Sequence, residues 1–497
     1  MHATRTHRRP WLLAVLALAV GCGGTRGNPG ENHAPVDAGC DGAACVAVDP
    51  CVTDAHATGC GFKVVAGAFH VFGVTSDNYA LIADANDSAS MLDLASGTLT
   101  PFATDYSWSA ISGDVAFAFH GAPYGSSPQA VAIWTAANGV RELDASSAAF
   151  NNWPQTDGTH VVWFGNVSSD GSTGDVIVGT VDGLTPYKTL LAGANLSGNC
   201  SFGPNLHLVG THVIFSTCQT GLFASTLYSY DVDSGALVGS TPSEGAYETF
   251  NSDNSLMMFS SDSGTSVADL DLAQVTVLAT DFQNGMFTPD GKSVLYADNE
   301  NALQLISVTG GAPTLVQPGP ATFAQAISPD GTVALYSNLS DDQANADLYL
   351  TSLVPNAPPP LALRTTADAQ ILSNPFTADG NFALYAANVD AAYNGVLWAQ
   401  PTVGGAGRML TKLDFYWQTL DGSRLLYTDV PVESTTGSGR NDAVANIDLV
   451  DLSTGAAPTQ LVSNANAYFY TTTDNETLVY AVYDDVTRAG VYTMKLP

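Results

Sequence analysis

The chain has 497 residues, of which 45% are hydrophobic and 12% are charged, with 15 Lys and Arg against 47 Asp and Glu. A net charge of −32 makes nucleic acid and anionic lipid surfaces unfavourable partners, because both repel an acidic protein. The length is sufficient for a large core, and no tract made only of Gln or Ser indicates extensive disorder.

The first 21 residues are typical of a secretory signal. Three arginines precede an apolar run from Trp11 to Val20 that is too short to span a bilayer. The residues before Cys22 are similar to a bacterial lipobox, so we expect Cys22 to be acylated and to hold the protein at the bacterial envelope, in the outer membrane. The alternative is ordinary signal cleavage, with Cys22 in a disulfide. Removal of residues 1–21 leaves 12 basic and 47 acidic residues, because it takes away three arginines and no acid.

Residues 22–61 are predicted to be a lipidated tether that contains a cysteine-rich segment. Residues 23–37 are mostly Gly, Pro, Asn and charged residues, which have almost nothing to bury and favour a flexible linker. In an oxidising compartment the four cysteines that follow are expected to form two disulfides, with three connectivities open. The alternative is a zinc site, although the segment has no Cys-x-x-Cys pair and only His56 nearby. The four cysteines are Cys40, Cys45, Cys51 and Cys60.

From residue 62 to residue 497 a tight turn followed by an apolar strand recurs. In the fullest copy, Ser328-Pro329-Asp330-Gly331 precedes the strand Val333–Tyr336. Proline, Asp and Gly suit a tight turn, whereas β-branched and aromatic residues favour an extended strand. In eight copies an aromatic residue falls six positions after the first turn residue. The turns with an Asp-Gly pair are Asp157-Gly158, Asp290-Gly291, Asp330-Gly331, Asp379-Gly380 and Asp421-Gly422.

These repeats predict an all-β propeller of four-stranded blades. Two weaker copies, near Asp77 and Gly113, bring the number to about ten, and the spacing of about forty residues is that of propeller blades. Strands such as Val294–Ala297 are apolar at successive positions, which indicates burial on both faces. Asp347–Ser352 and Ala268–Leu272 are expected to be the strands that come next in their units. One large ring and two smaller rings both remain open.

The turn and strand pattern resembles that of the TolB-type propeller family. Ser328-Pro329-Asp330-Gly331 matches the family's Ser-Pro-Asp-Gly turn, and Thr288-Pro289-Asp290-Gly291 differs from it at one position. The resemblance covers residues 62–497 and implies the propeller fold. It does not imply one activity, since blades of this kind serve as periplasmic scaffolds and as accessory domains of peptidases.

The two ends of the repeat region are expected to share one blade. The last copy begins at Asp474 and has no outer strand after its final segment. Residues Phe62–Ala66 have the β-rich composition of the outer strands elsewhere, such as Val275–Leu278. We therefore expect residues 62–66 to complete the last blade, which would remove two exposed strand edges.

The search for chemistry yields few candidates. The sequence has no nucleophile elbow, zinc-protease motif, phosphate loop or dinucleotide fingerprint, so no catalytic residue is predicted. Cys200 and Cys218 lie on either side of the turn at 209–211, which predicts a hairpin disulfide, with free thiols as the alternative. The histidines that follow the signal segment could form a site in the early blades or could be hydrogen-bonded within strands. They are His33, His56, His70, His120, His160, His207 and His212.

Three acidic loops, at 84–87, 168–175 and 341–347, offer oxygen ligands of the kind that calcium accepts. The alternative is that these loops are solvated turns, in which Asp and Asn bond their own backbone. No other cofactor is expected.

Three classes of function follow from these observations. The prediction is a non-catalytic binding or scaffold platform that receives a protein or saccharide partner at the cell envelope. The alternatives are a propeller enzyme of lactonase or lyase type, with a site that no linear motif reveals, and a structural surface protein.

Overall fold

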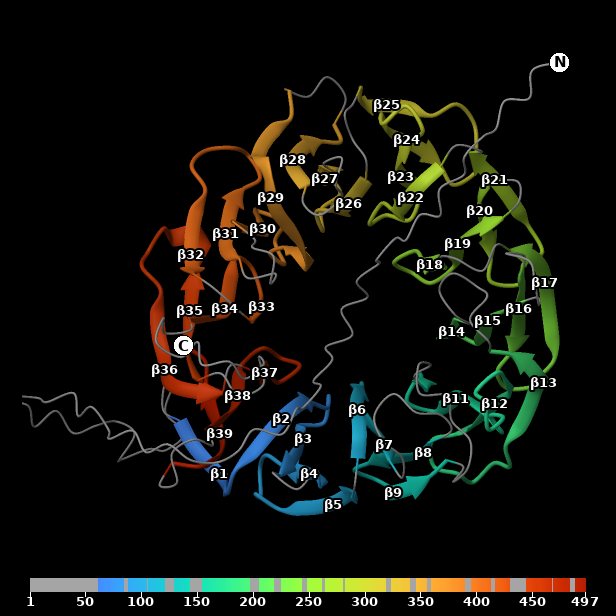
Figure 1. Cartoon of the computed structure of the whole chain (residues 1–497), viewed down its shortest axis with the longest axis vertical. Helices are drawn as coiled ribbons and strands as arrows, with labels where there is room; N and C mark the ends of the chain where they lie inside the picture. The colour runs from blue at the N-terminus through green and yellow to red at the C-terminus, as the bar shows by residue number, and fades with distance from the viewer. Residues whose placement is uncertain are drawn as a thin grey trace, which may run out of the picture.

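The computed structural model of the protein is an all-β ring of ten antiparallel, four-stranded blades (Figure 1). It confirms the predicted propeller, and the ring is single. The described residues contain one short 3-10 helix, η3 (Leu452–Thr454), and no helix that is long and apolar enough to span a membrane. The described residues are 61–84, 88–104, 106–120, 129–143, 154–196, 205–218, 225–243, 248–261, 264–279, 282–318, 323–339, 346–354, 359–388, 395–412, 416–429, 444–466, 468–482 and 488–497.

The blades follow one another along the chain, and in each of the first nine the chain runs from the innermost strand outwards. Blades 1 to 3 are β2 (Phe69–Val74), β3 (Tyr79–Asp84), β4 (Ala89–Asp93) and β5 (Leu99–Ala103); β6 (Tyr106–Ser112), β7 (Val115–His120), β8 (Ala130–Thr135) and β9 (Gly139–Glu142); and β10 (Gln155–Thr156), β11 (His160–Gly165), β12 (Thr173–Thr180) and β13 (Lys188–Asn195). Blades 4 to 6 are β14 (Leu206–Val209), β15 (His212–Cys218), β16 (Ser225–Asp231) and β17 (Leu237–Ser243); β18 (Thr249–Phe250), β19 (Leu256–Ser261), β20 (Gly264–Asp269) and β21 (Val275–Ala279); and β22 (Phe282–Phe287), β23 (Ser293–Asp298), β24 (Leu303–Ser307) and β25 (Thr314–Gln317).

Blades 7 and 8 share a strand. Blade 7 is β26 (Phe323–Ile327), β27 (Val333–Leu339), β28 (Ala346–Ser352) and the first part of β29 (Leu361–Phe376), and blade 8 is the rest of β29 with β30 (Phe382–Ala387), β31 (Val396–Pro401) and β32 (Arg408–Lys412). Residues of β29 up to Ala369 pair with β28, and those from Gln370 onwards pair with β30. The chain therefore passes from the outside of one blade to the inside of the next without leaving the extended conformation.

Blades 9 and 10 close the ring. They are β33 (Trp417–Thr419), β34 (Arg424–Asp429), β35 (Val444–Asp451) and β36 (Thr459–Asn466); and β37 (Phe469–Thr471), β38 (Thr477–Val482) and β39 (Gly490–Lys495), with β1 (Gly61–Ala66) as the outermost strand. The pairing of β1 with β39 is antiparallel and runs from Gly61 opposite Met494 to Ala66 opposite Gly490. This pairing confirms that the N-terminal strand completes the last blade.

The hydrophobic core lies in the seams between neighbouring blades. Each blade buries one face against the blade before it and the other against the blade after it, so its second strand has no polar face; in β23, Val294, Leu295, Tyr296 and Ala297 are all buried. The aromatic residues six positions after the eight turns are likewise all buried. They are Trp163, Phe215, Phe259, Tyr296, Tyr336, Tyr385, Tyr427 and Tyr480.

One predicted strand is wrong in its position. The sequence predicts a strand over Ala268–Leu272, but β20 ends at Asp269 and Leu272 has a φ of +56° in the turn that follows. Leu270 and Leu272 are both buried in the seam between blades 4 and 5. The alternating Leu residues therefore reflect a turn that buries its side chains, not a strand.

The antiparallel order gives the ring two different faces. The connections from first to second strand and from third to fourth strand lie on one face, which we call the turn face, and run from two residues to the eight residues of 353–360. The other connections begin and end at the opposite face, which we call the loop face. They vary from none, within β29, to the fourteen residues between β34 and β35.

Candidate functional site

The repeated Asp-Gly turns lie on the turn face and act as structural locks. In blade 7 the Ser328 hydroxyl donates to Asp330 Oδ1 at 2.6 Å and accepts from the Val333 amide at 3.0 Å. Gly331 between them has a φ of +73°, a region that favours glycine. The same positive φ occurs at Gly158, Gly291, Gly380 and Gly422, in blades 3, 6, 8 and 9.

The carboxylates of these turns accept hydrogen bonds from groups of the same turn. In blade 6 the Thr288 hydroxyl donates to Asp290 and lowers its pKa, because the bond favours the ionised form. Asp379 and Asp157 also accept bonds from their own turns, and Asp421 binds Arg424. These aspartates stabilise the repeat and leave little capacity for a ligand.

The histidines of the described residues do not converge on one site. His70 Nδ1, on the innermost strand of blade 1, lies 3.3 Å from Nδ2 of Asn466 at the end of β36 in blade 9, and His120 Nε2 lies 2.9 Å from Glu142 within blade 2. His212 bonds Asp271 of the next blade at 2.8 Å. Apart from His207, each described histidine therefore has a structural partner. His33 and His56 lie outside the described residues.

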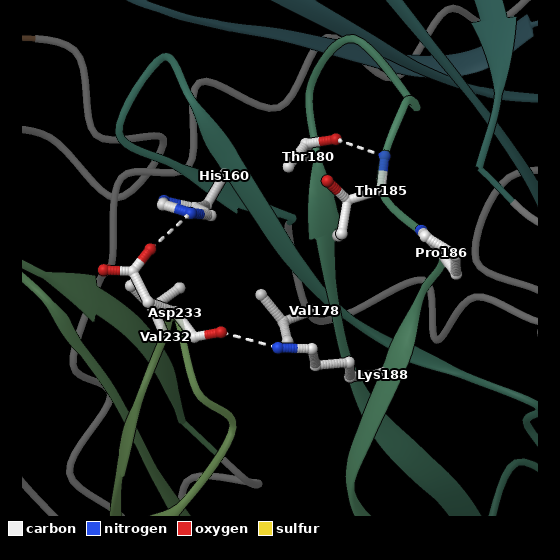
Figure 2. Close-up of a pocket in the computed structure, with 9 residues that line it drawn as sticks. His160, Val178, Thr180, Thr185, Pro186, Lys188, Val232 and Asp233 are labelled. Carbon is white, nitrogen blue, oxygen red and sulfur yellow. Dashed lines mark hydrogen bonds and ion pairs between the residues drawn. The ribbon is translucent and has the colours of Figure 1, made fainter.

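A small cleft between blades 3 and 4 on the turn face shows how these histidines are used (Figure 2). His160 lies 3.0 Å from Asp157 of its own turn and 3.2 Å from Asp233 of blade 4, and Lys188 donates to the Asp233 carbonyl. The volume of about 170 Å³ is below the range of roughly 300–1,000 Å³ that is usual for ligand pockets. The polar side chains at this cleft therefore join blade 3 to blade 4.

The other predicted sites are only partly within the described residues. In the loop 168–175, Asp170 accepts bonds from Ser168 and Ser172, and the Ser168 hydroxyl is the main cause that lowers its pKa to about 2. No group of three or more His, Cys, Asp or Glu in the described part of the chain is arranged to hold a metal ion. Most of the loops 84–87 and 341–347, together with Cys22, Cys40, Cys45, Cys51, Cys60 and Cys200, lies outside it, and so does the side chain of Cys218.

The seam between blades 4 and 5 contains a polar cluster that the sequence did not reveal, which we call the blade 4/5 cluster. It consists of Asn205 and His207 at the innermost strand of blade 4, Ser216 on β15, and Glu248 and Phe250 at the innermost strand of blade 5. Asn205 Nδ2 donates to Glu248 Oε2, and the rings of His207 and Phe250 lie edge to face with centroids 5.1 Å apart. The hydrogen bond and the ring contact thus join the innermost parts of blades 4 and 5.

Two atoms of the blade 4/5 cluster are buried without a hydrogen-bond partner in the described structure. They are Nε2 of His207 and Oε1 of Glu248. Burial lowers the pKa of His207 to about 4, and burial also raises the pKa of Glu248 against opposing bonds from Asn205 and Ser216. Both changes favour the uncharged form. His207 was a candidate from the sequence, whereas Glu248 was missed because only the packing of two repeats brings it into contact with Asn205.

No protein-family model matches the chain, and no curated protein matches it in sequence. Solved structures that are similar to it include a eukaryotic initiation factor, at 11% identity over 71% of this chain and 90% of the other, with a TM-score of 0.47. They also include a putative TolB from Agrobacterium tumefaciens, at 16% identity over 53% and 94%, with a TM-score of 0.27. A third is an oligogalacturonate lyase in complex with manganese, at 12% identity over 68% and 98%, with a TM-score of 0.36. These values support no statement about activity.

Proposed function

We propose that the protein is a non-catalytic binding or scaffold platform of the bacterial envelope, with the loop face as its recognition surface for a protein or saccharide partner. The observation that supports this most is the difference between the two faces. The turn-face connections have two to eight residues and include the repeated Asp-Gly turn, whereas the loop-face connections range from none to fourteen residues on the same repeated strands. Greater length variation on one face of a rigid scaffold is typical of recognition surfaces.

The anchor is part of the same proposal. An acyl group on Cys22, followed by a tether up to residue 61, would hold an acidic ring at a membrane that its charge does not favour. The TolB-type family remains our assignment for the repeats, on their Ser-Pro-Asp-Gly turns.

The test blocks one face at a time. Ser169 is exposed on the loop face of blade 3, and Leu184, whose exposed fraction is 84%, lies on the turn face of the same blade. Each is replaced by Cys and coupled to a bulky maleimide polymer, and the parent protein treated in the same way reports any reaction of native cysteines. Capture of partners from detergent-solubilised envelopes should be reduced by the label on Ser169→Cys and retained with the label on Leu184→Cys. Equal capture by both would contradict the assignment of the loop face.

A propeller enzyme is the second candidate, and one observation favours it. Two titratable side chains with shifted pKa values lie in one cluster, which is common at catalytic sites. The fate of a bound ligand distinguishes the platform from the enzyme. After incubation with the protein, a binding platform releases the ligand unchanged, whereas an enzyme converts it.

A further inference from the structure

The small cleft between blades 3 and 4 has a buried floor and an exposed rim (Figure 2). The lining residues of the floor, Val178, Gly179 and Val232, are buried, whereas those of the rim, among them Lys188 and Asp233, are exposed. The volume of about 170 Å³ is too small for a drug-sized ligand, but it is close to the roughly 150 Å³ cavity that holds one benzene ring. The cleft therefore has room for about six non-hydrogen atoms and is open to solvent.

The rim carries one positive and one negative side chain with unused hydrogen-bonding capacity. The Lys188 ammonium donates to the Asp233 carbonyl oxygen and to no other described group, so two of its three N–H groups remain for a ligand. Asp233 Oδ1 lies 3.2 Å from Nε2 of His160, whereas Asp233 Oδ2 has no partner among the described residues. The Thr185 hydroxyl, which also lines the cleft, has no partner in the same part of the structure.

The next seam lacks the space that this cleft provides. His212 and Asp271 form the same kind of pair between blades 4 and 5, with Nε2 and Oδ1 2.8 Å apart. There, however, Gly239 of β17 packs so closely against Asp271 that a Cβ on the glycine would overlap the Asp271 carbonyl oxygen. In blade 3 the side chain of Lys188 reaches the equivalent carbonyl oxygen, and the cleft stays open beside it.

The two charges of the rim select a ligand that carries both signs. A lone carboxylate bonded to Lys188 would share the small cleft with the carboxylate of Asp233, and a lone ammonium bonded to Asp233 would share it with the ammonium of Lys188. Like charges at such close quarters are unfavourable. A zwitterion satisfies both side chains and has no net charge for the net charge of −32 to repel. The buried Val178 and Val232 favour a short aliphatic group on the same ligand.

We propose that the cleft between blades 3 and 4 binds a small zwitterionic α-amino acid of about the size of alanine. The ammonium of the ligand bonds Asp233 Oδ2, and its carboxylate accepts from Lys188 and from the Thr185 hydroxyl. Its aliphatic side chain contacts Val178 and Val232. The site lies on the turn face, so this inference goes beyond the loop-face platform and does not depend on it.

The experiment titrates the intact protein with L-alanine, propionate and ethylamine, of which the last two lack the ammonium and the carboxylate of alanine. NMR of labelled valine methyl groups follows Val178 and Val232, with Val267 in the seam between blades 5 and 6 as the internal reference. L-alanine should shift the signals of Val178 and Val232 saturably, in the millimolar range expected for a ligand of few atoms. Propionate and ethylamine should each bind at least tenfold more weakly, because each lacks one set of charge-assisted hydrogen bonds.

Two variants and one control locate the site. Asp233→Asn and Lys188→Met should each weaken the binding of L-alanine tenfold or more, because each removes one charge of the rim. Asp271→Asn is the matched control, since it removes the same kind of carboxylate beside a histidine at the seam that Gly239 fills. It should bind L-alanine as the parent does.

Three results would overturn the inference. The first is no saturable change at Val178 and Val232 with L-alanine. The second is binding of propionate or of ethylamine as tight as that of L-alanine, which would show that the cleft recognises one charge only. The third is an equal loss of binding in Asp271→Asn and Asp233→Asn, each with a parent-like melting temperature. The comparison of the three ligands uses the parent protein, so it decides the question even where a variant fails to fold.

Discussion

Replacement of the imidazole of His207 is expected to make the fold less sensitive to acid. Burial lowers the pKa of this side chain from 6.5 to about 4. Between these values the unfolded chain binds a proton that the folded chain does not, so stability present above pH 6.5 is lost as the pH falls towards 4. At about 1.4 kcal/mol for each pKa unit, the loss reaches about 3 kcal/mol.

The variant for this test is His207→Phe, which does not titrate and can pack on the ring of Phe250. The free energy of unfolding in urea is measured for parent and variant at pH 7.5, 6, 5 and 4. The carboxylates titrate in both proteins, so the difference between the stability curves of parent and variant isolates the contribution of His207. The parent should lose about 3 kcal/mol more than the variant over this range.

Glu248→Gln supplies a control of opposite sign. The pKa of Glu248 is raised, so its contribution to stability is present below the ordinary value of 4.5 and is lost as the pH rises through the folded value. The Gln variant should therefore gain stability over the parent at neutral pH and lose that advantage in acid. Parallel pH curves for all three proteins would refute the burial of this pair.

Three further predictions concern the turns, the closure and the anchor. Gly331→Val should destabilise the protein by about 1–3 kcal/mol in urea unfolding, because a β-branched residue is strained at a φ of +73°. Gly331→Asn is the matched control and should cost much less, since Asn78, Asn254 and Asn475 adopt φ values of 66°, 56° and 57° in the equivalent turns; equal losses would argue against backbone strain. Deletion through Ala66 should increase hydrogen exchange in β38 and β39, because it leaves the edge of β39 unpaired, and full protection there would contradict closure by β1. Cys22→Ala should release the protein from membranes, and equal membrane association of variant and parent would exclude the acyl anchor.

The architecture could be predicted from the sequence because its signals are local. The turn at Ser328–Gly331 and the aromatic residue Tyr336 lie within one repeat, and the burial of Tyr336 needs only that blades stand on both sides. The closing strand was also accessible, since a missing outer strand at one end and an extra strand at the other are visible in the sequence. The turn and the burial of its aromatic residue depend on residues that are close together in the chain, whereas the closure follows from a comparison of the two ends of the repeat region.

Features that depend on contacts between repeats could not be predicted from the sequence. The number of rings follows from small rotations between neighbouring blades, which no residue pattern encodes directly. The continuity of β29 results from the way in which blade 7 meets blade 8, where the chain needs no turn. Asn205 and Glu248 come from different blades, and their hydrogen bond exists only after the two innermost strands lie side by side.

The turn face is constrained further by bonds between successive turns. Ser252 of blade 5 donates to the Pro289 carbonyl of blade 6 at 2.7 Å, and the Asp379 amide of blade 8 donates to the Gly422 carbonyl of blade 9 at 3.2 Å. A change in one of these turns therefore alters the position of the next blade. In a closed ring that displacement reaches the pairing of β1 with β39. Loop-face connections can vary in length without this effect, because the strands that they join are already fixed by their seams. Variation for binding can therefore accumulate on the loop face.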